Sequence, residues 1–86
     1  MKEQDYQSKV IKRFEKNGYY VINLIKTNKS GISDLLALKN GEPPIFIEMK
    51  SLVGKLSRLQ EYRLQEQKSM GFKVYYSKGD KLIEYV

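Results

Sequence analysis

The chain has 86 residues and a formal net charge of +6 at pH 7, which predicts one small domain whose positive charge suits a polyanion such as nucleic acid as well as it suits solubility alone. No apolar run exceeds four residues, the length of the run at 35–38, and no apolar segment follows the N-terminus, so we expect neither a membrane span nor a secretory signal. Cysteine and histidine are absent, which excludes disulfides, zinc sites, thiol nucleophiles and imidazole bases.

The first half of the chain predicts a helix followed by three strands. Tyr6, Val10 and Phe14 recur at helical spacing, and Asn17-Gly18 ends the helix. The helix is expected at residues 3–16, the strands at 19–25, 33–39 and 44–50, with a basic loop at 26–31 and a turn at Asn40-Gly41. The third strand is apolar on both faces, which predicts a central place in the sheet.

The second half predicts one more helix and two more strands. The helix is expected at residues 57–70, ending at Gly71, and the strands at 72–76 and 81–86. The apolar stripe of this helix is weak and consists of Leu56, Leu59 and Tyr62. The order of elements is typical of a small α/β or α+β domain.

Two charged residues close the strand that should be central. Glu48 and Lys50 are two positions apart, so their side chains point to the same face of the sheet, about 6–7 Å apart. An acid and a lysine separated by one residue are common on strands. A solvated strand end therefore explains this triplet well when it is taken alone.

A second carboxylate is expected beside Glu48. If the strands at 33–39 and 44–50 form a hairpin about Gly41, the numbers of opposite residues sum to about 82, which places Asp34 opposite Glu48. Like charges in that arrangement destabilise a sheet, and a divalent cation between them would offset the repulsion. Oxygen ligands favour Mg²⁺ or Mn²⁺. In isolation, Asp34 also fits a turn residue that bonds its own backbone.

Three segments together resemble a known enzyme family. They are residues 31–34 (Gly-Ile-Ser-Asp), 48–50 (Glu-Met-Lys) and 54–60 (Gly-Lys-Leu-Ser-Arg-Leu-Gln). They are similar to the motifs of the PD-(D/E)XK nuclease superfamily, and within it to the compact, standalone VRR-NUC domain of phages and bacteria. Ser33 stands where that family usually has proline. The resemblance implies a single nuclease domain over 1–86, with a restriction-endonuclease-like αβββαβ core, a mixed sheet flanked by two helices, and a short extra C-terminal strand.

The resemblance also implies a metal-dependent catalytic site. It assigns Asp34, Glu48 and the backbone carbonyl of Met49 to Mg²⁺ or Mn²⁺. Lys50 is expected to position or deprotonate the attacking water and to offset charge on the phosphate. Gln60 is expected to face the metal centre, although Ser57-x-x-Gln60 also fits a helix capping box.

Further site residues are expected at the edges of this centre. Glu3 shares a helical stripe with Val10 and Phe14, so we expect it to face the sheet. Nucleases of the resembled superfamily often add a carboxylate from their first helix, so the resemblance implies that Glu3 joins the catalytic residues. The alternative is an acid favoured by the helix dipole. The candidate DNA-phosphate contacts are Lys26, Lys29, Lys55 and Arg58, whereas Arg63 fits an ordinary surface charge better.

The resemblance therefore implies a metal-dependent DNA endonuclease without a small-molecule cofactor. Its expected substrate is branched DNA such as four-way (Holliday) junctions, and its expected form is a homodimer in the cytoplasm, or in the host cytoplasm if the protein is phage-encoded. A flap or nicking nuclease on the same site and a catalytically silent nucleic-acid-binding module remain alternatives. A small basic protein that binds another protein would leave the pairing of the carboxylates unexplained.

Overall fold

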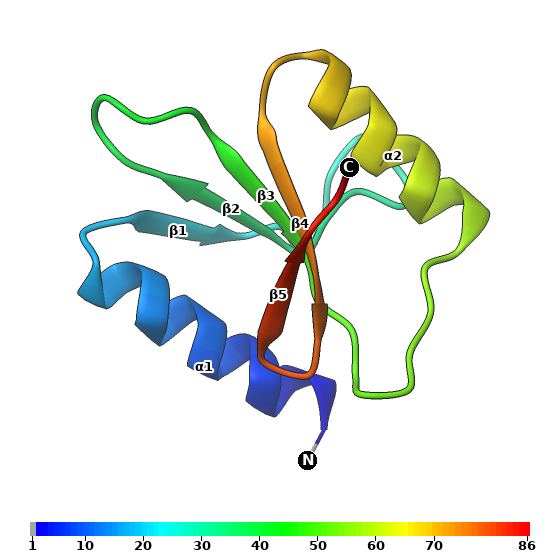
Figure 1. Ribbon diagram of the computed structural model, residues 1–86, viewed down its shortest axis with the longest axis horizontal. Helices are drawn as coiled ribbons and strands as arrows, with labels where there is room; N and C mark the ends of the chain where they lie inside the picture. The colour runs from blue at the N-terminus through cyan, green and yellow to red at the C-terminus, as the bar shows by residue number, and fades with distance from the viewer. Residues whose placement is uncertain (1) are drawn as a thin grey trace.

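The computed structural model describes residues 2–86, which form two helices and one five-stranded sheet (Figure 1). In chain order the elements are α1 (Glu3–Lys16), β1 (Tyr20–Asn23), β2 (Leu35–Leu38), β3 (Ile45–Glu48), α2 (Arg58–Ser69), β4 (Lys73–Lys78) and β5 (Lys81–Glu84). The strands lie side by side in that same order, with β3 in the middle; β3 and β4 are parallel and the other neighbours are antiparallel. The predicted fold class, a mixed sheet flanked by two helices with an extra C-terminal strand, is confirmed. Within the described part of the chain, neither helix combines the length and apolar character needed to cross a membrane.

The hairpin of β2 and β3 has the predicted register. Leu35 lies opposite Ile47 and Ala37 opposite Ile45, so the numbers of opposite residues sum to 82. Both strands are shorter than the predicted 33–39 and 44–50. One reason is that the Met49 N–H donates to the side chain of Asp34, at 2.7 Å, where a longer ladder would use a backbone carbonyl.

The remaining boundaries differ by a few residues. β1 and β5 are also shorter than predicted, whereas β4 extends to Lys78 because Gly79, at φ +63°, turns the chain tightly into β5. In the second helix Ser57 and Met70 are caps outside the helix, so the predicted 57–70 becomes Arg58–Ser69.

One face of the sheet packs against α1 and is apolar. Tyr6 and Val10 are the buried residues of that helix. They contact a layer of buried side chains from the two central antiparallel strands and their ends: Leu35, Ala37, Ile45, Ile47 and Met49. This layer is the hydrophobic core of the domain.

The opposite face packs against α2, and Figure 1 shows the two helices on opposite sides of the sheet. The buried residues of α2 are Leu64 and Gln67. Of the weak apolar stripe noted in the sequence, Leu59 and Tyr62 are 43% and 57% exposed. This helix packs partly through polar contacts, which an apolar periodicity does not report.

Candidate active site

Asp34 and Glu48 meet at the open end of the β2–β3 hairpin. Asp34 directly precedes β2, and Glu48 is the last residue of β3. One Asp34 carboxylate oxygen accepts the Met49 N–H bond, which fixes the orientation of this side chain. The two carboxyl groups lie close enough for Asp34 to raise the pKa of Glu48, through its charge and through hydrogen bonding to the protonated acid.

The environment of Glu48 favours its protonated form. The side chain is only 3% exposed. Burial raises its pKa from 4.5 to about 9, with further upward contributions from the hydrogen bond and the charge of Asp34 and from the charge of Glu3, while the nearby charge of Lys50 lowers it. Glu48 therefore ionises near neutral pH only when a further positive charge joins it.

The oxygen atoms at this point fit a divalent cation. Glu48 Oε1 is buried and has no hydrogen-bond partner among residues 2–86, and a buried acceptor of that kind calls for a positive partner. The carboxylates of Asp34 and Glu48 and the carbonyl of Met49 offer only oxygen, which is the donor type that Mg²⁺ and Mn²⁺ prefer. No cluster of three or more acidic side chains is placed to hold a metal in the described residues. A metal here would therefore depend on two carboxylates and a carbonyl.

The backbone of Lys50 is fixed by the neighbouring hairpin of β4 and β5. The Lys50 N–H donates to Ser77 Oγ at 2.7 Å, and the Ser77 hydroxyl donates back to the Lys50 carbonyl at 3.1 Å. The same carbonyl accepts the Gly79 N–H at 3.0 Å. Ser77 is 1% exposed. The sequence analysis did not single it out, because Ser77 lies just beyond the strand predicted at 72–76 and its partner is distant in the sequence.

Gln60 forms the predicted capping box and also contacts the buried carboxyl group of Glu48. Its N–H donates to Ser57 Oγ at 3.1 Å, and its side-chain oxygen accepts the Ser57 N–H at 2.9 Å, which completes the capping box of α2. Its side-chain nitrogen donates to Glu48 Oε2 at 3.3 Å. The helix start is therefore tied directly to the buried carboxyl group.

The segment that leads into Asp34 packs closely against α2. Gly31 has φ +75°, and a Cβ atom there would lie 2.5 Å from Leu59 Cγ, so only glycine permits this approach. Ser33 is fully buried and donates to Gln67 Oε1 at 3.1 Å. These contacts fix the backbone immediately before the catalytic candidate.

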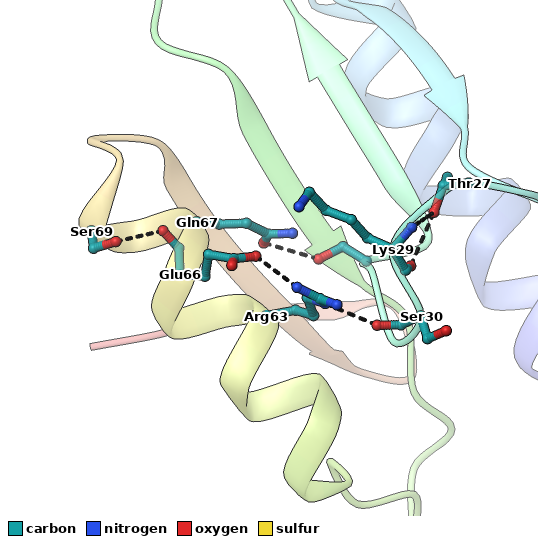
Figure 2. Close-up of polar contacts among 8 residues, drawn as sticks. Thr27, Lys29, Ser30, Arg63, Glu66, Gln67 and Ser69 are labelled. Carbon is teal, nitrogen blue, oxygen red and sulfur yellow. Dashed lines mark hydrogen bonds and ion pairs between the residues drawn. The ribbon is translucent and has the colours of Figure 1, made fainter.

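Arg63 of α2 also contacts the loop that leads into Asp34, as Figure 2 shows. Its Nε donates to the Ser30 carbonyl at 2.9 Å, and its guanidinium pairs with Glu66 at 3.0 Å. Leu59, Arg63 and Gln67 are spaced by four residues and therefore share one stripe of the helix. Arg63 thus tethers the loop before Asp34, a role that the surface-charge interpretation missed because its partner is a distant backbone carbonyl.

Glu3 lies outside the buried group. The expectation that it faces the sheet with the core residues was wrong, because Glu3 belongs to the first turn of α1 and is exposed, whereas Tyr6 is the first buried residue of that helix. Its charge nevertheless raises the pKa of Glu48. Glu3 is therefore near enough to influence the carboxyl pair electrostatically.

Lysines line two hollows in this part of the molecule. Asp34, Lys26 and Lys29 line a hollow of about 350 Å³. Lys50 and Lys55 line a larger one of about 460 Å³, which neither Asp34 nor Glu48 lines. The remaining predicted phosphate contact, Arg58, is exposed at the first position of α2.

Comparison with known protein families gives one match. The sequence model of the VRR-NUC domain matches residues 19–81 of the chain. The matched segment contains Asp34, Glu48, Lys50 and Gln60, whereas α1, with Glu3, precedes it. A comparison with curated proteins finds no match.

Proposed function

The chain belongs to the VRR-NUC family of nuclease-type DNA-processing domains, and from this premise we propose that it is a metal-dependent DNA endonuclease that hydrolyses phosphodiester bonds. The observation that carries the proposal is the pair formed by Asp34 and Glu48. Burial of a carboxyl group beside a second one destabilises the fold unless its charge is compensated. A cation bound next to Lys50 would compensate it.

We assign separate roles to the residues of this pair and its surroundings. Asp34, Glu48 and the carbonyl of Met49 would hold Mg²⁺ or Mn²⁺, which when bound neutralises phosphate charge and activates water. The Lys50 ammonium orients the attacking water and stabilises negative charge that develops on the phosphate. Gln60 holds Glu48 in place through its amide. Contacts of Lys26, Lys29, Lys55 and Arg58 with neighbouring phosphates would hold the DNA and make binding sensitive to salt.

The preferred substrate in this proposal is branched DNA such as a four-way junction, cut by a homodimer in the cytoplasm. One catalytic centre cuts one strand, and a two-fold dimer matches the approximate two-fold symmetry of a junction. β5 is an edge strand of the sheet, and its unpaired backbone groups offer a surface for a second copy.

The test uses the pure protein with four DNA forms: a four-way junction, a flap, a single strand and a linear duplex. Each is incubated with Mg²⁺, Mn²⁺ or EDTA. We expect the junction to be cut fastest, with either metal and not in EDTA. Glu48→Ala and Lys50→Ala should abolish cutting and retain DNA binding.

The matched controls are Glu42→Ala and Lys68→Ala, which remove an exposed acid in the β2–β3 turn and an exposed lysine late in α2. Both should cut like the parent. Parental cutting by Glu48→Ala would overturn the proposal. Binding of branched DNA without cutting in any metal would instead identify a nucleic-acid-binding module.

A further inference from the structure

The hollow of about 460 Å³ beside Lys50 is larger than phosphate binding requires. It lies between the loop after β3, the start of α2 and the strands β4 and β5. Its volume is within the range of about 300–1,000 Å³ that is typical of small-molecule sites. An occupant with the size of a nucleotide base fits this space.

The hollow begins directly beside the candidate catalytic residues. Tyr76 lines it and is the register partner of Glu48 on the parallel neighbouring strand. Neighbouring strands are about 4.8 Å apart. Lys50 also lines the hollow. Whatever fills it therefore lies within about one nucleotide of a phosphate at the carboxyl pair.

The walls of the hollow combine two tyrosine rings with charged side chains, three lysines and the two acids Glu61 and Glu84. Tyr76 and Tyr85 both line it, and the Tyr85 hydroxyl accepts a hydrogen bond from Gln65 of α2 at 3.1 Å, which orients the ring. Lys55 and Lys78 lie on its border with Lys50. Tyrosine rings stack on nucleobases of any sequence, and lysines bind the phosphates on either side.

We propose that this hollow receives one unpaired base of the DNA strand that is cut, next to the scissile phosphate. The inference rests on the proposed nuclease function and defines its substrate class. A base inside a continuous duplex is stacked on both sides and cannot reach such a space unless it is flipped out. DNA with an unpaired nucleotide at the cut, as at a flap, a bulge or a junction whose base pairs open at the branch point, is therefore the substrate that fits.

The first test measures binding and needs no cleavage. The dissociation constants of an oligothymidylate and of an abasic oligomer of equal length are compared in EDTA. Since stacking on one aromatic ring contributes about 10-fold or more to affinity, the parent should prefer the oligothymidylate by about that factor. Tyr76→Ala should lose this preference, and Tyr76→Phe, which keeps the ring, should retain it.

A matched control removes a tyrosine elsewhere. Tyr20→Ala truncates a side chain that is 71% exposed on the edge strand β1, and it should keep the full preference. Tyr85→Ala provides a second variant of the hollow if Tyr76→Ala does not fold by circular dichroism. An unchanged preference in a folded Tyr76→Ala or Tyr85→Ala variant would overturn the inference.

The second test determines whether the bound base is next to the cleaved phosphate. The cleavage position is mapped, and the nucleotide on each side is replaced in turn by an abasic analogue. One replacement should raise KM by about 10-fold for the parent and have little effect in Tyr76→Ala, because both changes remove the same contact. If neither replacement changes KM while Glu48→Ala is inactive, the base site is wrong and the nuclease proposal stands. If Glu48→Ala still cuts, the nuclease proposal itself fails.

Discussion

The two faces of the sheet use alternate residues of the same strands, yet they bury different chemistry. On the α1 face, Ile45 and Ile47 are at most 5% exposed and lie in an apolar layer. On the α2 face, Glu48 and Gln67 are buried just as deeply, at 3% and 4%. Apolar burial stabilises the fold, whereas burial of a carboxyl group opposes it. The comparison indicates that the α1 face supplies the stability that allows the α2 face to carry a buried carboxyl group.

The sharpest test of this division is Glu48→Gln. The change keeps the size of the side chain and removes the carboxylate that the proposed mechanism needs. We expect the single-turnover cleavage rate with Mg²⁺ to fall by about 10²–10³-fold, as is typical for one electrostatic group at a reacting centre. Glu42→Gln, in the exposed turn, is the control and should retain the parental rate. A rate that falls equally in both variants would contradict the special role of Glu48.

The same residue should make stability depend on pH in metal-free buffer. Its pKa is about 9 in the folded protein, against an ordinary value of 4.5. Between these two pKa values the folded state keeps a proton that the unfolded state has released, so the contribution of Glu48 to the free energy of unfolding should be fully present below pH 4.5 and be lost as pH rises toward 9. One group contributes a slope of at most about 1.4 kcal/mol per pH unit.

The window from pH 6 to 8 isolates this effect. The chain has no histidine or cysteine, so apart from the α-amino group Glu48 is the expected titrating group there. Urea denaturation in EDTA should give a falling midpoint for the parent and a flatter one for Glu48→Gln. Added Mg²⁺ should raise the parental midpoint at pH 8. Equal slopes for the two proteins would show that Glu48 is ionised in the folded state.

The α1 face is tested by Ile47, which is next to Glu48 in β3. Ile47→Ala removes buried apolar volume from the core and should lower the free energy of unfolding by about 2–5 kcal/mol. Cleavage per folded molecule should not change, because Ile47 points away from the site. If the alanine variant does not fold, Ile47→Val should lower stability by about 0.5–1.5 kcal/mol with the same unchanged activity. A selective loss of activity in the folded valine variant would show that the α1 face also contributes to catalysis.

Sequence reasoning predicted the local part of this arrangement well. The Asn40-Gly41 turn fixed the register of one hairpin, and the register brought Asp34 to Glu48, since both depend on short stretches of chain. The capping box of Gln60 was equally local. The alternation of side chains along β3 predicted that Glu48 and Lys50 lie near each other, and the charge of Lys50 does lower the pKa of Glu48.

The contacts that the sequence did not reveal are made between distant segments. Ser77 reaches Lys50 through the β4–β5 hairpin, and Arg63 reaches Ser30 across 33 positions. Neither contact has a periodic signal, because each depends on how α2 and β4 return to the sheet. The exposure of Glu3 was mispredicted for a related reason: helical spacing identifies a stripe, but not the point at which the helix meets the sheet.

One of these distant contacts gives a smaller prediction. Arg63→Ala removes the tether to Ser30 and the ion pair with Glu66, and should lower the free energy of unfolding by about 1–2 kcal/mol, as for hydrogen bonds to a charged group. The segment before Asp34 would then be less well held, so kcat should fall while KM changes little. Arg63→Lys keeps the charge but cannot make both contacts, and should behave more like alanine than like the parent. A change confined to KM would instead indicate that Arg63 binds DNA.

The smallest effects should come from the start of α2, where Gln60 both completes the helix cap and contacts Glu48. Ser57→Ala removes the cap and should lower the free energy of unfolding by about 1 kcal/mol, as for other N-cap residues. Cleavage should be retained, because the amide of Gln60 still reaches Glu48. Gln60→Ala should give a similar loss of stability and a further loss of activity of about 10-fold, typical of residues that hold a metal ligand. Thermal unfolding and single-turnover rates of both variants separate the two functions. Equal activities would mean that Gln60 acts only as part of the cap, and that cleavage depends on Asp34, Glu48 and Lys50 without its help.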